Sequence, residues 1–146
     1  MNEKIAKLNL EQIAEGDSFS FAEVLSEDML DRFAALSQDT SPLHMEKSFA
    51  QGRGFAGRVV HGALLVALFS RLVGKFIPGE NGLLQSLTAH FLLPAYPGDH
   101  VLVKGIVDQV SAATRTIVLK ATIETIPGGK ILTKAKIQIG FTQEQK

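Results

Sequence analysis

The hydrophobic pattern divides the chain into a helical first half and a strand-rich second half. Weak alternation over 16–26 predicts a first strand, and apolar residues at helical spacing over 26–37 predict a short helix. Ser26 is the expected N-cap of that helix, with two acidic residues in its first turn. Over 60–77 nearly every residue is apolar, which predicts one long helix enclosed on most sides. The Pro and Gly residues of 78–82 are expected to end it.

After residue 82 the period changes to that of strands. Four candidates follow, with turns at 97–99 and 127–130: residues 83–96, 100–110, 114–126 and 131–141. In the last two, alternate residues form one apolar face: Ile117, Leu119, Ala121 and Ile123, then Ile131, Thr133, Ala135, Ile137 and Ile139. The sequence therefore predicts an α+β fold in which an antiparallel sheet wraps around one long buried helix, with 1–146 as a single domain.

Composition and charge exclude several classes of function. The chain has 146 residues, and its 15 basic side chains balance its 15 acidic ones, so no basic field attracts nucleic acid or an anionic membrane. The absence of cysteine excludes disulfides, a thiolate nucleophile and a cysteine metal site. Charges interrupt both the N-terminal residues and the apolar stretch at 60–77, so neither reads as a signal peptide or a membrane span. We therefore expect a cytoplasmic protein.

Residues 37–58 have little periodicity and contain Pro42 and three glycines, so we predict a long ordered loop. The loop carries Asp39 and His44, and the proline between them bends the chain. An acid and an imidazole that converge on one water molecule can share its proton transfers. The alternative is that Asp39 turns the backbone and His44 is a solvated loop residue, which composition alone favours.

The motif FAALSQDTSPLH, followed by VVHGALLVALFSRLVG, resembles the R-specific enoyl-CoA hydratases, also called hydratase 2 or MaoC-like. The resemblance is to the small single-domain enzymes that supply polyhydroxyalkanoate synthesis, and it covers 14–141. It implies a hotdog fold and the reversible addition of water to a trans-2-enoyl-CoA, giving (R)-3-hydroxyacyl-CoA. It also implies that neither a metal nor a redox cofactor takes part.

Matched residue by residue, the resemblance implies that Asp39 and His44 are catalytic. It implies that the backbone N–H of Gly62 binds the thioester oxygen, and free N–H groups at a helix start suit a developing negative charge. It places Ser70 in the acyl pocket, whereas the hydroxyl of a helical serine can instead bond a carbonyl one turn back. Which of the acid and the imidazole acts as base stays open.

Two positions depart from the family pattern. Ser41 replaces the usual Asn, which makes hydrogen bonds at the active site in some members of the family. A serine is shorter and reaches those partners less well, so we expect an effect on rate or substrate range. Gln38 replaces a common Gly or Glu, which we expect to matter less because a loop neighbour need not face the site.

The remaining histidines and arginines receive lesser roles. We expect His61 to support the site from behind, and His90 and His100 to lie on the surface. The four histidines lack metal-ligand spacing, so no metal site is expected. Arg53 and Arg58, near the expected entrance, are candidates to meet CoA phosphates.

Two other functions fit the same fold. Many hotdog thioesterases place a carboxylate on the buried helix, but 60–77 contains no Asp or Glu. A non-catalytic acyl-CoA binding module would not need the paired Asp39 and His44. As in the family, we expect a homodimer whose sheets join edge to edge. The sequence fixes neither the acyl length nor whether CoA or acyl carrier protein carries the substrate.

Overall fold

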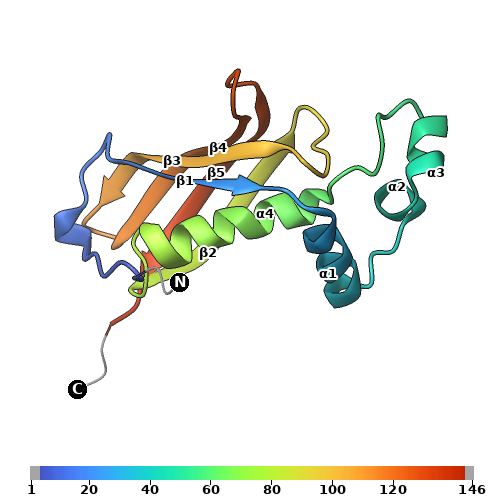
Figure 1. The fold of residues 1–146 in the computed structure, drawn as a ribbon. Helices are drawn as coiled ribbons and strands as arrows, with labels where there is room; N and C mark the ends of the chain where they lie inside the picture. The colour runs from blue at the N-terminus through green and yellow to red at the C-terminus, as the bar shows by residue number, and fades with distance from the viewer. Residues whose placement is uncertain (1–3, 144–146) are drawn as a thin grey trace.

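Residues 4–143 of the computed structural model form a five-stranded antiparallel sheet with a helix across one face (Figure 1). The strands are β1 (Ser18–Val24), β2 (Gly82–Phe91), β3 (His100–Ser111), β4 (Thr116–Thr125) and β5 (Ile131–Phe141). Their order in the sheet is β1-β3-β4-β5-β2, so β1 and β2 are the edges. All the predicted strands are present, and the two predicted apolar faces point into the core, except that Leu132 and not Ile131 is buried at the start of β5.

The helical elements precede the last four strands. They are the 3-10 helix η1 (Leu10–Gln12), α1 (Glu27–Ser37), α2 (Pro42–Met45), α3 (Lys47–Gly52), α4 (Gly62–Arg71) and the π-helix η2 (Leu72–Phe76). Ser26 caps α1 as predicted, since its Oγ accepts a hydrogen bond of 3.1 Å from the Met29 amide. None of the helices among residues 4–143 is long and apolar enough to cross a bilayer.

The central helix buries its large side chains against the sheet. Leu64, Leu65, Leu68 and Phe69 of α4 join the core that includes Ile117, Leu119 and Ile137. The single helix predicted over 60–77 is instead α4 followed directly by the π-helix η2, in which the Ile77 amide bonds the Leu72 carbonyl five residues earlier. The small residues of this helical stretch face outward: Ala63, Ala67, Ser70 and Gly74. Enclosure within this chain is therefore confined to the bulky face of the helix.

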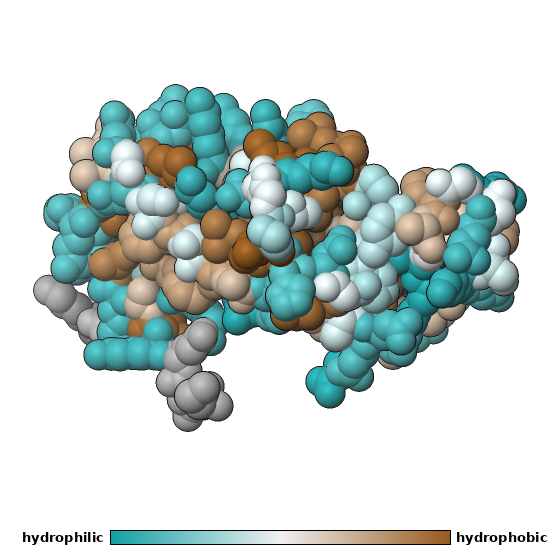
Figure 2. Space-filling model, turned by 45° about the horizontal axis from the view of Figure 1, so that its top comes forward, coloured by the Kyte–Doolittle hydropathy of each residue, from teal (hydrophilic) through white to brown (hydrophobic). Residues whose placement is uncertain are grey.

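The prediction of a long ordered loop over 37–58 is wrong in one respect, because the segment contains the short helices α2 and α3. Pro42 occupies the first turn of α2, where its fixed φ suits a helix and its missing N–H is not needed. The segment projects from the end of the sheet beyond α1 (Figure 1) and forms a lobe at one end of the molecule (Figure 2). Helices of four and six residues are too short to show a periodic pattern.

Replacing Gln38 by Gly is expected to stabilise the protein by about 0.5–1 kcal/mol. Gln38 ends α1 at φ 62°, in the left-handed region where a side chain costs energy and glycine does not. Ala35→Gly, in the last turn of the same helix at ordinary helical dihedrals, is the control and should destabilise by about 1 kcal/mol. Urea denaturation measures both free energies of unfolding. Destabilisation by both variants would contradict the strain assigned to Gln38.

Candidate active site

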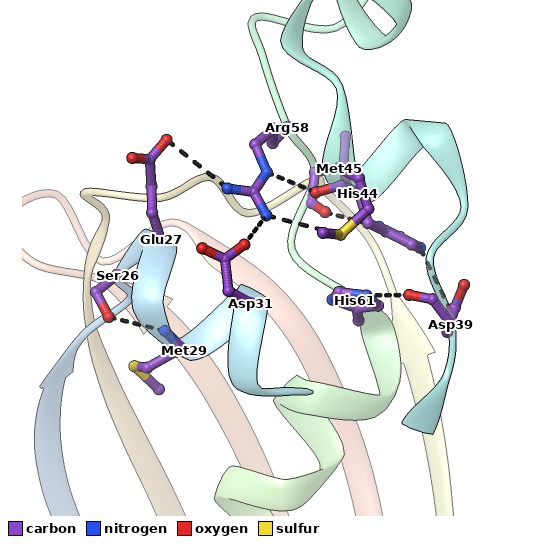
Figure 3. Close-up of polar contacts among 10 residues, drawn as sticks. Ser26, Glu27, Met29, Asp31, Asp39, His44, Met45, Arg58 and His61 are labelled. Carbon is purple, nitrogen blue, oxygen red and sulfur yellow. Dashed lines mark hydrogen bonds and ion pairs between the residues drawn. The ribbon is translucent and has the colours of Figure 1, made fainter. Parts of the chain in front are cut away.

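Asp39 and His44 converge, as the sequence predicts. Asp39 lies just after α1 and His44 within α2, and 3.8 Å separates Asp39 Oδ2 from His44 Nε2 (Figure 3). That separation is longer than a direct hydrogen bond, but both atoms can contact one water molecule at about 2.8 Å. The imidazole is partly buried and the carboxylate is exposed. The bend between the two residues thus brings an acid and a base together.

The backbone around Asp39 fixes the direction of its carboxylate. The Ser41 amide donates a hydrogen bond of 3.3 Å to Asp39 Oδ1, and Ser37 Oγ accepts one of 3.1 Å from the Asp39 amide. Asp39 Oδ1 is therefore held by the turn, while Oδ2 faces His44. Ser41 contributes its amide here, and its exposed side chain makes no helix-capping bond. Its part in substrate binding stays a prediction.

A carbonyl fixes the tautomer of His44. Its Nδ1 lies 2.7 Å from the Val59 carbonyl oxygen. Because a carbonyl oxygen can only accept, Nδ1 carries the hydrogen and the neutral ring keeps a lone pair on Nε2. That lone pair is on the nitrogen facing Asp39. The imidazole is thus oriented to take a proton on the side where the carboxylate lies.

Arg58 joins the His44 segment to α1. Its Nε donates to the His44 carbonyl at 2.7 Å, and its Nη2 donates to Asp31 Oδ1 at 2.6 Å (Figure 3). The side chain is only 12% exposed, and Nη1 lies 3.9 Å from Glu27 Oε1. This guanidinium is committed to protein partners, which argues against the predicted contact with CoA phosphates. Arg53 is exposed and stacks over the Phe49 ring at 4.5 Å.

His61 completes the cluster, although the sequence predicts only a supporting role for it. It is buried, its Nε2 lies 3.0 Å from the Asp39 carbonyl oxygen, and its ring stacks on His44 with centroids 4.1 Å apart. One feature of the sequence could have indicated that His61 lies in the cluster: it directly precedes Gly62 at the start of the buried helix.

Asp39, His44 and His61 have potential ligand atoms within 4.8 Å of one another, so a metal ion has to be considered. The rings of His44 and His61 are stacked, with an interplanar angle of 26°. Stacked rings direct their lone pairs side by side, whereas a tetrahedral zinc site needs them to converge on one point. Each ring has one nitrogen against a backbone carbonyl, which leaves the other able to bind a metal, so only the stacking argues against a shared ion. We therefore assign no metal to this cluster.

A cavity of about 330 Å³ lies beside the cluster. Its lining includes His44, Phe55, Val59, Gly62, Leu65 and Phe91. Gly62 is the first residue of α4, where backbone N–H groups have no acceptor within the helix. Phe91 packs against it, since a Cβ on Gly62 would lie 3.0 Å from Phe91 Cζ. An apolar cavity bordered by an imidazole and a helix N-terminus suits an acyl thioester.

Ser70 is not brought to this cavity. It lies on the outward face of α4, two turns after Gly62, and is exposed. Its predicted contact with the acyl chain stays a prediction.

Comparison with known proteins finds one domain family, described as "MaoC like domain", that matches residues 11–128. The chain is 44% identical over 69 residues to an (R)-specific enoyl-CoA hydratase of Aeromonas caviae, covering 47% of this chain and 52% of that protein. It is 37% identical over 87 residues to a mitochondrial 3-hydroxyacyl-[acyl-carrier-protein] dehydratase of Arabidopsis thaliana, covering 60% and 51%. The chain thus spans about half the length of these curated relatives.

Solved structures resemble this one over nearly its whole length. An (R)-hydratase from A. caviae involved in PHA biosynthesis has a TM-score of 0.85 at 28% identity, with 90% of this chain and 99% of that chain covered. An unliganded R-hydratase from Pseudomonas aeruginosa has a TM-score of 0.88 at 22% identity, covering 97% and 90%. These likenesses confirm the predicted hotdog fold.

Proposed function

Because this chain belongs to the MaoC-like domain family, we propose that it is an (R)-specific enoyl-CoA hydratase. It adds water reversibly to a trans-2-enoyl-CoA and gives the (R)-3-hydroxyacyl-CoA. The observation that carries the proposal is the separation of 3.8 Å between Asp39 Oδ2 and His44 Nε2, beside a cavity that also exposes the start of α4. The named activities of the similar proteins support the same reaction class.

The tautomer of His44 makes it the base of this reaction. Its Nε2 takes a proton from water as the oxygen bonds to C3, and the electron pair of the double bond moves toward C2 and the thioester oxygen. The imidazolium then returns that proton to C2. The second hydrogen stays on the oxygen, and this O–H donates a hydrogen bond to Asp39 Oδ2, while the carboxylate stabilises the transient positive charge on His44.

Gly62 stabilises the negative charge that develops on the thioester oxygen. Its amide opens α4, where the helix dipole favours an anion, and it borders the same cavity as His44. A hydrogen bond from this amide to the thioester oxygen strengthens as enolate character grows, which lowers the barrier. The side chain of Leu65, one turn later, adds apolar wall for the acyl group.

The test is the wild-type reaction with crotonyl-CoA, followed in parallel by loss of the enoyl absorbance and by release of free CoA. Hydration without CoA release, and a product that chiral analysis identifies as (R), supports the proposal. CoA release would indicate a thioesterase, and binding without turnover would indicate an acyl-CoA binding module. Crotonyl-acyl carrier protein is tested alongside, because one relative acts on that carrier.

A homodimer formed along β2 is the assembly we propose. β2 is an edge strand, and Leu83 and Leu84 at its start are both exposed. The unpaired backbone of an exposed apolar edge can pair with another strand. The net charge of the chain is zero, so two copies do not repel each other by net charge. Pairing of two β2 edges would also bring a second chain toward the exposed small residues of α4.

Leu84→Glu is expected to convert the dimer to monomer, because it places a charge at the proposed edge. Ile106→Glu is the matched control, since both leucine and isoleucine are 39% exposed and Ile106 lies on β3 inside the sheet. Sedimentation velocity measures the mass of each variant. A monomeric wild type, or dissociation by both variants alike, would contradict the β2 interface.

A further inference from the structure

His61 is a polar side chain in a place where an apolar one would be expected. It is only 1% exposed, at the N-cap of α4, and packs against the rings of His44 and Phe33. Burial of an imidazole is costly unless its nitrogens are satisfied. The reaction described above gives this side chain no step, so its burial needs another explanation.

The two nitrogens of His61 are in different situations. Nε2 lies 3.0 Å from the Asp39 carbonyl oxygen, which only accepts, so Nε2 is the donor. Nδ1 is buried and has no hydrogen-bond partner among residues 4–143. A hydrogen on Nδ1 would be a buried donor without an acceptor. The geometry therefore selects one tautomer, with the hydrogen on Nε2 and directed at Asp39.

The acceptor of this bond is the backbone of Asp39, which otherwise lies in an exposed link between α1 and α2. The bond ties that link to the start of α4, and the ring of His61 backs the ring of His44. The next residue in the chain is Gly62. The side chain of His61 thus contacts both the Asp39 backbone and the His44 ring (Figure 3). The backbone of His61 is bonded to the Gly62 amide, which borders the cavity.

We propose that His61 is a positioning residue, which holds the Asp39 carboxylate at its working separation from His44 by donating its Nε2 hydrogen to the Asp39 carbonyl. The role rests on the proposed hydratase function. It accounts for a histidine rather than a phenylalanine or leucine, because an apolar ring could fill the space but could not hold the Asp39 backbone. Misplacement of a reacting group by about 1 Å is enough to slow a reaction by roughly 100-fold.

His61→Gln and His61→Asn form a matched pair that separates the hydrogen bond from the stacking. The amide nitrogen of Gln reaches the place of the imidazole Nε2, whereas that of Asn reaches the place of Nδ1, and both variants lose the ring. We expect His61→Gln to keep kcat within about threefold, and His61→Asn to lose roughly 100-fold in kcat with KM changed by less than about threefold. His100→Asn, at an exposed position on β3, serves as the control with no effect.

An NMR measurement tests the contact without relying on turnover. Nitrogen shifts of wild-type His61 should show a hydrogen on Nε2 alone, and the Asp39 carbonyl carbon shift should be retained in His61→Gln and changed in His61→Asn. Equal kcat in the two variants, or a wild-type hydrogen on Nδ1, would overturn the proposal. If the wild type hydrates no enoyl thioester, the proposed function fails, and the carbonyl shift still decides whether His61 holds Asp39. If His61→Asn does not fold, the wild-type tautomer and His61→Gln decide.

Discussion

His44→Ala and Asp39→Asn are each expected to slow crotonyl-CoA hydration by about 10²- to 10⁴-fold while the fold is kept. His44→Ala removes the nitrogen that takes the water proton. Asp39→Asn keeps the shape of the side chain and its turn, but removes the charge 3.8 Å from that nitrogen. Asp39 is exposed, so its variant should change the melting temperature little, whereas His44→Ala also removes the bond to Val59 and the stacking on His61 and should lower it.

The double variant sharpens this prediction, because residues that act on one water molecule are not independent. We expect it to be about as slow as the slower single variant, and not slower by the product of the two effects. His90→Ala, an exposed histidine on β2, is the control for loss of an imidazole as such. Unchanged activity in both single variants would end the catalytic assignment of this pair.

The sheet was predictable because its strands carry their own signal. In β4 and β5 the side chains alternate between a core of isoleucine, leucine and alanine and a more polar face, so the sequence reveals which residues are buried. The N-cap role of Ser26 was also predictable, because an N-cap bonds an amide only three residues further along the chain. Local chemistry of this kind determines an element wherever the element is placed.

The lobe was harder to predict because distant contacts hold it. α2 has four residues, too few to be stable alone, and its position depends on Arg58 and Val59, which follow 14 and 15 residues after His44. The place of His61 depends on a bond to Asp39, 22 residues earlier. No periodicity reports such contacts, so the convergence of Asp39 and His44 was inferred from a family resemblance rather than from spacing.

The outward face of α4 shows a different limit. The helical stretch 60–77 is apolar on all sides. That pattern cannot tell whether a given side of the helix is covered by the chain's own sheet or by a second copy of the chain. The structure shows that the large residues are covered by the sheet, while Ala67 and Ser70 are exposed. Small outward residues allow another backbone to approach closely, which is consistent with the proposed dimer.

Gly62→Pro is expected to lower kcat by about 10²- to 10³-fold relative to Gly62→Ala. Proline removes the amide hydrogen that is proposed to bind the thioester oxygen, while alanine keeps it. The first position of a helix tolerates proline, because its N–H has no intrahelical acceptor. His61 already has φ −55° and ψ 132°, the extended conformation that a residue before proline prefers. The substitution should therefore leave α4 and the His61 contact in place.

The comparison with alanine removes the steric effect of the added Cβ. Either residue adds a Cβ that meets Phe91 at 3.0 Å, so both variants require the same half-exposed ring to turn aside. Their ratio of kcat values then reports the change at the amide nitrogen, where proline replaces the hydrogen by its Cδ, provided that circular dichroism shows equal helix content. Because the hydrogen bond strengthens only as charge develops on the oxygen, KM should differ little between the two. Equal kcat values for proline and alanine would mean that the start of α4 does not stabilise the enolate, and the charge would have to be met by another group lining the cavity.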